Sequence, residues 1–219
     1  DQMASAVASR NNALLLDCRS MQHMPIPVAK ELALIIIDSG IRRQLATSAF
    51  NQRRRECELA AQHYAIASLR DLTPEAMEAE KEGLQPEFFA RARHVVTEIA
   101  RVEPMAVALA HADTAALASI MRASHVSLRD DYEVTVPEVD RLVDVVSAAL
   151  GVGVAALGGV RMTGAGFGGC LVAVVHNSAV DTVMNAIEKT YNPTADTPAS
   201  AQVYIMAGGA REITPKATP

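Results

Sequence analysis

The chain has 219 residues, of which 50% are apolar and 21% are charged, and its formal net charge is -5 at pH 7. A chain of this size and composition can bury a substantial core, in one large domain or two small ones. The mild net charge and the scattered basic residues argue against nucleic acid as a partner.

The cysteines Cys18, Cys57 and Cys170 are odd in number and far apart, and no C-x-x-C pair occurs. A disulfide framework and a zinc site are therefore not indicated, and a reducing cytoplasm fits this pattern best. The longest aliphatic runs, at 32–37 and 171–175, are far shorter than the roughly 20 residues that cross a bilayer, so we expect no membrane partner.

The beginning of the chain is predicted to be rich in strands. Met3 and Val7, four residues apart, indicate a short helix that Asp1 can cap. Short apolar runs punctuated by Pro and Gly follow, and they predict strands at 13–18, 24–28 and 32–40.

The middle of the chain is predicted to be helical from residue 44 onward. Thr73 is a helix cap with Pro74 in the first turn, where its missing N–H costs nothing. An apolar stripe at helical spacing covers 89–102, and Pro104 should break or kink that helix. Further helices are expected at 115–128 and 137–150.

The last third returns to strands. Strands are expected near 158–163, 170–175 and 201–207, with a helix at 178–191 and a polar tail at 211–219. The order of elements predicts an α+β fold, an antiparallel sheet covered on one face by helices.

The stretch between the first two of these strands, 164–169, holds four glycines in six residues. Gly164, Gly166 and Gly169 satisfy G-x-G-x-x-G, but a dinucleotide site needs a helix after the glycines, and here a strand follows. Glu188 has a suitable spacing for the acidic partner of that motif, yet it falls in a predicted helix. Two interpretations stay open, a hairpin whose glycines serve packing and a backbone that approaches a ligand closely.

The stretch "GGVRMTGAGFGGC" resembles the third conserved motif of the GHMP sugar kinases in the form found in galactokinases. Four further segments agree with the galactokinase pattern in the same order. They are "MASAVASRNNALLLDCRS", "RRQLATSAFNQRRRECE", "FFARARHVVTEIARV" and "ASHVSLRDDYEVTVPEVDRLV". The resemblance implies that residues 1–219 are the C-terminal domain of a galactokinase-like GHMP kinase.

The resemblance implies ATP-dependent phosphorylation of the anomeric hydroxyl of galactose, with Mg²⁺. The family binds ATP and magnesium in an N-terminal half, which would be this chain's partner, so we expect the chain alone to be inactive. Asp1 matches the catalytic aspartate. The loop Thr163, Gly164, Ala165, Gly166, Phe167, Gly168 and Gly169 would bring unobstructed N–H groups toward the phosphate, with Gly164 and Gly166 also near the sugar.

Phe50 departs from the family pattern, which has a sugar-contacting tyrosine here in an S-E-Y context, and Ala49 replaces the glutamate. Phenylalanine keeps the ring and loses one hydrogen bond. We therefore keep two alternatives to galactose phosphorylation, a kinase for an amino sugar or a pentose, and a non-catalytic sugar sensor. Phe50 as an ordinary core aromatic is weighed evenly against a sugar contact.

Other polar residues are interpreted as structural. Arg53, Arg54 and Arg55 are expected to form a solvated or ion-paired helix face. Asp130 and Asp131 are expected to be turn and ion-pair residues, because adjacent aspartates diverge on most backbones. His94 and His125 are expected to pack inside helices.

Overall fold

The computed structural model describes residues 2–42 and 46–210, so Asp1 and the predicted tail at 211–219 lie outside the described residues. The strands are β1 Asn12–Leu16, β2 His23–Pro27, β3 Leu32–Asp38, β4 Gly158–Met162, β5 Cys170–His176 and β6 Ser200–Tyr204. The helices are α1 Gln2–Val7, α2 Ala46–His63, α3 Pro74–Ala79, α4 Pro86–Ala100, α5 Val102–His111, α6 Thr114–Asp130, α7 Pro137–Leu150 and α8 Val180–Ala186. No helix within these ranges is long and apolar enough to cross a membrane.

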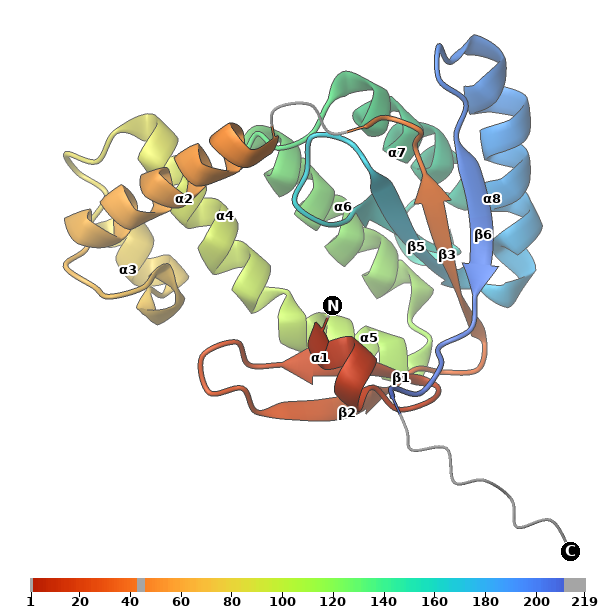
Figure 1. The fold of residues 1–219 in the computed structure, drawn as a ribbon, viewed down its shortest axis with the longest axis horizontal. Coiled ribbons are helices and arrows are strands. Elements are labelled where there is room, and N and C mark those ends of the chain that lie inside the picture. Colours follow the sequence, from red (N-terminus) through yellow and green to blue (C-terminus); the bar gives the residue numbers. More distant parts are fainter. Residues whose placement is uncertain (1, 43–45, 211–219) are drawn as a thin grey trace, which may run out of the picture.

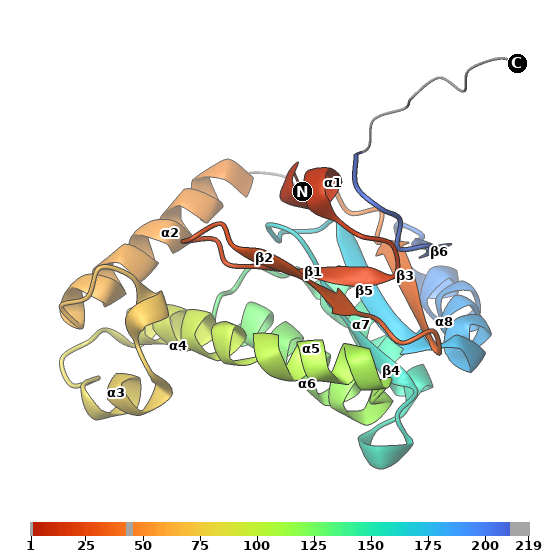
Figure 2. The same ribbon diagram turned by 90° about the horizontal axis from the view of Figure 1, so that it is seen from below.

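The main core lies between a sheet and a layer of helices. Strands β4, β5, β3 and β6 pair in that order, and every pair is antiparallel. Along β5 the buried side chains alternate, with Leu171, Ala173 and Val175 fully covered, as expected for a sheet with one face on the core. Helices α6, α7 and α8 lie against the sheet (Figures 1 and 2). The predicted α+β fold is confirmed.

The first two strands do not join this sheet. Strands β1 and β2 form a separate antiparallel hairpin, with Leu14 opposite Pro25. Pro25 and Pro27 have no N–H to donate, which limits the pairing that β2 can make with a further strand. The hairpin lies beside α5, and the N–H of Ala29 after β2 donates to the carbonyl of Leu109 (3.0 Å).

A second, smaller core joins α2, α3 and α4 around Tyr64 and Met77. The Thr73 side chain accepts a hydrogen bond from the N–H of Ala76, and Pro74 stands in the first turn, so the predicted cap is confirmed. The predicted break near Pro104 is also found. Helix α4 ends before Arg101, and the proline falls in the first turn of α5.

His94 is a buried polar side chain between the two cores, as expected. Its ring stacks on Tyr132 with centroids 4.3 Å apart, and its Nδ1 lies 3.0 Å from the Ser127 hydroxyl. That hydroxyl donates to Asp131, so Nδ1 carries the proton and donates to Ser127. Burial lowers the pKa of His94 to about 4, although the negative charges of Glu98 and Asp131 act in the opposite direction.

This shift predicts that the protein loses stability on acidification. Between the ordinary pKa of 6.5 and about 4, His94 is protonated in the unfolded chain and neutral in the folded one. The free energy of unfolding should therefore fall as the pH drops through this range, by up to about 3 kcal/mol. Urea denaturation at pH 7 and pH 4.5 should show a smaller loss in His94→Gln than in the parent protein.

His176→Gln is the matched control, because His176 hydrogen-bonds within an exposed turn. It should keep the parent's pH dependence. The same loss in His94→Gln as in the parent would assign the acid sensitivity to other groups.

Candidate functional site

The glycine-rich segment 163–169 is the connection of the β4–β5 hairpin. The N–H of Thr163 donates to the carbonyl of Cys170 (2.9 Å) and closes the loop at the ends of the two strands. The glycines therefore lie between two antiparallel strands, which confirms that they are not a dinucleotide-binding turn. The start of α2 lies beside this loop in both ribbon views (Figures 1 and 2).

The loop is held at two points by other parts of the chain. The N–H of Phe167 donates to the carbonyl of Val134 (2.6 Å), and the N–H of Gly169 donates to the carbonyl of Ile41 (2.9 Å). A Cβ on Gly166 would lie 2.4 Å from the Val134 oxygen, and one on Gly168 would lie 2.8 Å from the Ile41 oxygen. Close packing of backbone on backbone therefore requires both of these glycines.

These contacts correct one expectation about the loop. The N–H groups of Phe167 and Gly169 are used inside the protein, so not all of the loop amides are unobstructed. Gly164 and Ala165 form the exposed tip, and their N–H groups make no hydrogen bond to another described residue. The part of the loop that can meet a ligand is thus its first half.

Phe50 lies in the first turns of α2 and is 46% exposed. The interpretation of Phe50 as a core aromatic is therefore wrong. An exposed aromatic ring is suited to contact a sugar, whose C–H faces pack on rings, and the helix that carries Phe50 begins near the loop. Whether Phe50 contacts a sugar stays a prediction.

Helix α1, which follows Asp1, is held by hydrogen bonds from residues 209 and 210 near the other end of the chain. The N–H of Gly209 donates to the carbonyl of Ala8 (2.7 Å), and that of Ala210 donates to the carbonyl of Ser5 (2.7 Å). A Cβ on Gly209 would lie 2.9 Å from the carbonyl group of Ala6. No motif predicted this contact, although the Gly208-Gly209 pair is a signal for a close approach of backbones.

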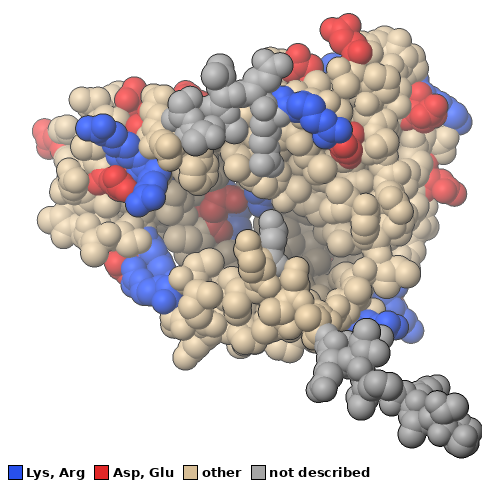
Figure 3. Space-filling model, in the orientation of Figure 1, with Lys and Arg blue, Asp and Glu red and all other residues tan. Residues whose placement is uncertain are grey.

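A cavity of about 240 Å³ separates the β1–β2 hairpin from α4, α5 and α6. Its polar wall consists of Glu98, Arg101, Ser124 and Arg161. One carboxylate oxygen of Glu98 lies 2.6 Å from Arg101 Nη1, and the other lies 3.6 Å from Arg161 Nη1. Burial lowers the pKa of Arg161, while Glu98 opposes that shift. Figure 3 shows this face of the molecule hollowed near its centre, with acidic and basic side chains inside. No sequence motif marks this wall, because α4, α6 and β4 each supply part of it.

Four of the charged residues that the sequence marked as structural form ion pairs, as predicted. Arg54 pairs with Glu58 along the exposed face of α2, and Arg53 pairs with Glu56. Asp130 pairs with Arg129, and Asp131 with Arg93. In the ranges that the structure covers, no three His, Cys, Asp or Glu side chains are grouped so that they could hold a metal ion.

Comparison with known proteins shows what this chain is similar to. The family model described as "GHMP kinases C terminal" matches residues 105–193. A galactokinase from Actinobacillus succinogenes is 42% identical over 194 residues, which cover 87% of this chain and 49% of that protein. A galactokinase from Haemophilus influenzae is 41% identical over 216 residues, which cover 97% of this chain and 55% of that protein. The chain thus spans about half the length of these curated relatives.

Solved structures show a similarity to the same family of kinases. The crystal structure of Lactococcus lactis galactokinase complexed with galactose matches with a TM-score of 0.85 and 31% identity, over 97% of this chain and 55% of that chain. The crystal structure of L. major mevalonate kinase in complex with R-mevalonate matches with a TM-score of 0.53 and 15% identity, over 91% of this chain and 50% of that chain, which shows a shared fold alone. The resemblance to galactokinases is confirmed.

The packing of the loop gives a prediction for Gly166→Ala. Gly166 has a φ of +88°, and a side chain there meets the Val134 carbonyl, so the substitution combines backbone strain with a clash. Gly153→Ala is the control, because Gly153 has a φ of +66° and nothing within 4 Å of the added Cβ. We expect Gly153→Ala to cost about 1 kcal/mol and Gly166→Ala to cost a further 1–3 kcal/mol, roughly the usual cost of overpacking.

Urea denaturation of the two variants measures this difference. Equal losses would show that only the φ angle matters at Gly166 and that the contact with Val134 is loose.

Proposed function

Because this chain is a GHMP kinase C-terminal domain whose relatives are galactokinases, we propose that it forms the C-terminal part of an ATP-dependent galactokinase. The reaction is transfer of the γ-phosphoryl group of ATP to the anomeric hydroxyl of galactose, which gives galactose 1-phosphate and ADP. The observation that carries the proposal is the match to Lactococcus lactis galactokinase along 97% of this chain. We also infer a cytoplasmic location, with the free thiols of Cys18, Cys57 and Cys170 as support.

Phosphoryl transfer needs positioning and charge stabilisation more than covalent help from the protein. In our proposal Asp1 orients the anomeric hydroxyl and accepts its proton as the new P–O bond forms. Phe50 lies against the sugar, and the exposed tip of the glycine loop donates N–H groups to the phosphoryl oxygens. Only the first half of the loop takes part, since Phe167 and Gly169 donate elsewhere.

The residues of this chain fit a phosphate better than they fit a metal ion. The tip at Gly164 and Ala165 offers backbone donors on an exposed turn, which suits an anion. The described residues offer no matching group of carboxylates for Mg²⁺. We therefore assign ATP and Mg²⁺ binding to a further N-terminal domain, as the resemblance implies, and derive no step from the metal.

The proposed role of Asp1 gives a prediction for its substitution by asparagine. In the full-length protein, Asp1→Asn should lower kcat for galactose by about 100-fold or more, the usual scale for a general base. The KM for galactose should change much less, because the carboxylate acts mainly on a proton that moves in the transition state. An assay that couples ADP release to NADH oxidation measures both constants.

A near-normal kcat for Asp1→Asn would remove Asp1 from catalysis. A full-length parent protein that binds galactose without any turnover would support the alternative of a sugar sensor.

The proposed sugar contact of Phe50 gives a prediction for Phe50→Tyr. The ring is exposed, so the added hydroxyl does not disturb a packed core. If the ring lies beside galactose, one new neutral hydrogen bond of about 0.5–1.5 kcal/mol should lower the KM for galactose roughly two- to tenfold. The KM for ATP should hardly change.

Measuring KM for galactose, an amino sugar and a pentose in both proteins distinguishes the sugar alternatives. A loss for one of the other sugars would identify it as the preferred substrate. No change for any sugar would show that Phe50 does not contact the substrate.

A further inference from the structure

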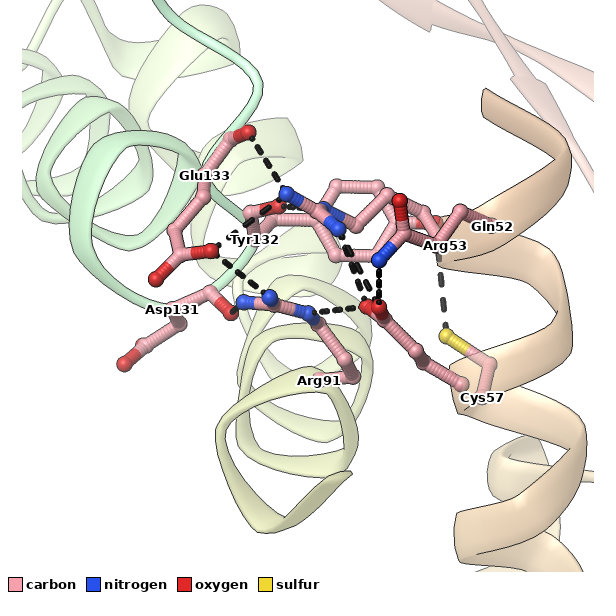
Figure 4. A network of polar contacts seen from close by, with 8 residues as sticks. Gln52, Arg53, Cys57, Arg91, Asp131, Tyr132 and Glu133 are labelled. Atoms are coloured by element: carbon pink, nitrogen blue, oxygen red, sulfur yellow. Dashed lines mark hydrogen bonds and ion pairs between the residues drawn. The ribbon is translucent and has the colours of Figure 1, made fainter. Parts of the chain in front are cut away.

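A cluster of buried charges joins α2 and α4 to the segment 131–134 (Figure 4). The side chains of Arg91, Glu56 and Arg53 are only 3%, 7% and 11% exposed. Glu56 accepts from Arg91 Nε (2.7 Å) and from Arg53 Nη1 (3.1 Å). Buried ion pairs are costly to desolvate, and apolar side chains of the same volume often stabilise a fold as well or better. Stability alone therefore does not account for this cluster.

The two arginines also donate hydrogen bonds to backbone carbonyls. Arg91 donates to the carbonyl of Asp131, and Arg53 donates to the carbonyls of Tyr132 (2.6 Å) and Glu133 (3.2 Å). Three consecutive carbonyls are thus fixed by two planar guanidinium groups. A guanidinium carries its donors on three nitrogens in a rigid fork and so reaches acceptors that lie apart, whereas a lysine carries all its donors on one nitrogen.

Glu133 shows that the backbone is constrained here. Its φ is +51°, in the left-handed region that non-glycine residues rarely adopt. Its carboxylate accepts from Arg91 Nη2 (2.7 Å) and Arg53 Nη2 (3.3 Å), so both ends of the residue are held by the same arginines. The cluster stabilises an unusual conformation just before Val134.

Val134 is the residue that the glycine loop contacts through its backbone. It is 2% exposed, its carbonyl accepts the N–H of Phe167, and Gly166 passes against it with no room for a Cβ. At the other end of the cluster, Arg53 lies three residues after Phe50 on α2, about one helical turn away. Hydrogen bonds to the backbone of 132–134 from both sides therefore link the helix of Phe50 to the glycine loop.

We propose that Arg53, Glu56 and Arg91 are positioning residues that fix the glycine loop relative to Phe50 through the backbone of 131–134. The part of this inference that concerns catalysis rests on the proposed function, and the part that concerns the loop does not. In the part of the chain that the structure describes, none of these side chains hydrogen-bonds to the loop 163–169, so we infer that they act through Val134.

Hydrogen–deuterium exchange of the full-length protein tests the link without any activity. In Arg53→Met and Arg53→Lys, exchange in peptides that cover 163–169 should become about tenfold faster or more. Arg54→Met is the matched control, because Arg54 is 74% exposed and, among the described residues, pairs only with Glu58 along its own helix. Loop exchange in that variant should equal the parent's.

Kinetics of the same variants test the consequence for the reaction. At temperatures well below each variant's midpoint of unfolding, Arg53→Lys should lower kcat/KM for galactose about 10- to 100-fold, since small misplacements of reacting groups have effects of this size. Arg54→Met should not. Because lysine keeps the charge, a defect in Arg53→Lys identifies the forked contacts as the cause.

Unchanged loop exchange in folded Arg53→Met or Arg53→Lys would overturn the proposal. If neither protein folds, Glu133→Gln decides, because that side chain is 58% exposed and its loss removes one of the two carboxylates that both arginines share. Faster loop exchange supports the proposal and unchanged exchange refutes it. A full-length parent that does not phosphorylate galactose would refute the proposed function, while the exchange comparison would still test the link.

Discussion

The arrangement of the site depends on one close contact between backbones, where the loop at 166–167 meets Val134. The N–H of Phe167 donates to the carbonyl of Val134 (2.6 Å), and Gly166 has no Cβ that would keep the two backbones apart. The second contact, with Ile41, fixes the other side of the loop. With its second half fixed in this way, the loop presents only the tip at Gly164 and Ala165 to a ligand. The glycines thus serve packing and ligand access together, and the two interpretations of the motif are not exclusive.

The two cores meet at the segment that supports the loop. The sheet and its helices form one core, α2, α3 and α4 form the other, and residues 131–134 pass between them. Arg91 and Glu56 come from the smaller core, and Val134 belongs to the larger one. Burial opposes ionisation of Glu56, yet the arginines hold the pKa of its carboxyl below the ordinary value, so the cluster stays charged. Charge at this junction gives a directional connection that apolar packing does not.

Local signals in the sequence predicted most of the elements. Thr73 with Pro74, and Pro137 with Gly151, marked helix ends because caps act within one turn, and a short continuous apolar run marked β5 as a buried strand. The separation of the β1–β2 hairpin from the sheet was not predicted, since strand periodicity does not identify the neighbouring strand. The bonds from Arg53 to residues about 80 positions away were equally invisible, because they depend on tertiary packing. Exposure of Phe50 could not be predicted either, as an aromatic near a helix start suits a core and a surface alike.

We propose that Phe50 and the tip of the glycine loop face one shared substrate site. The decisive measurement is a crystal structure of the full-length protein with bound galactose. We expect the sugar to lie against the ring of Phe50, with its anomeric hydroxyl toward Gly164 and Ala165. Galactose bound away from both elements would contradict it, and so would a loop displaced from Val134 in the complex.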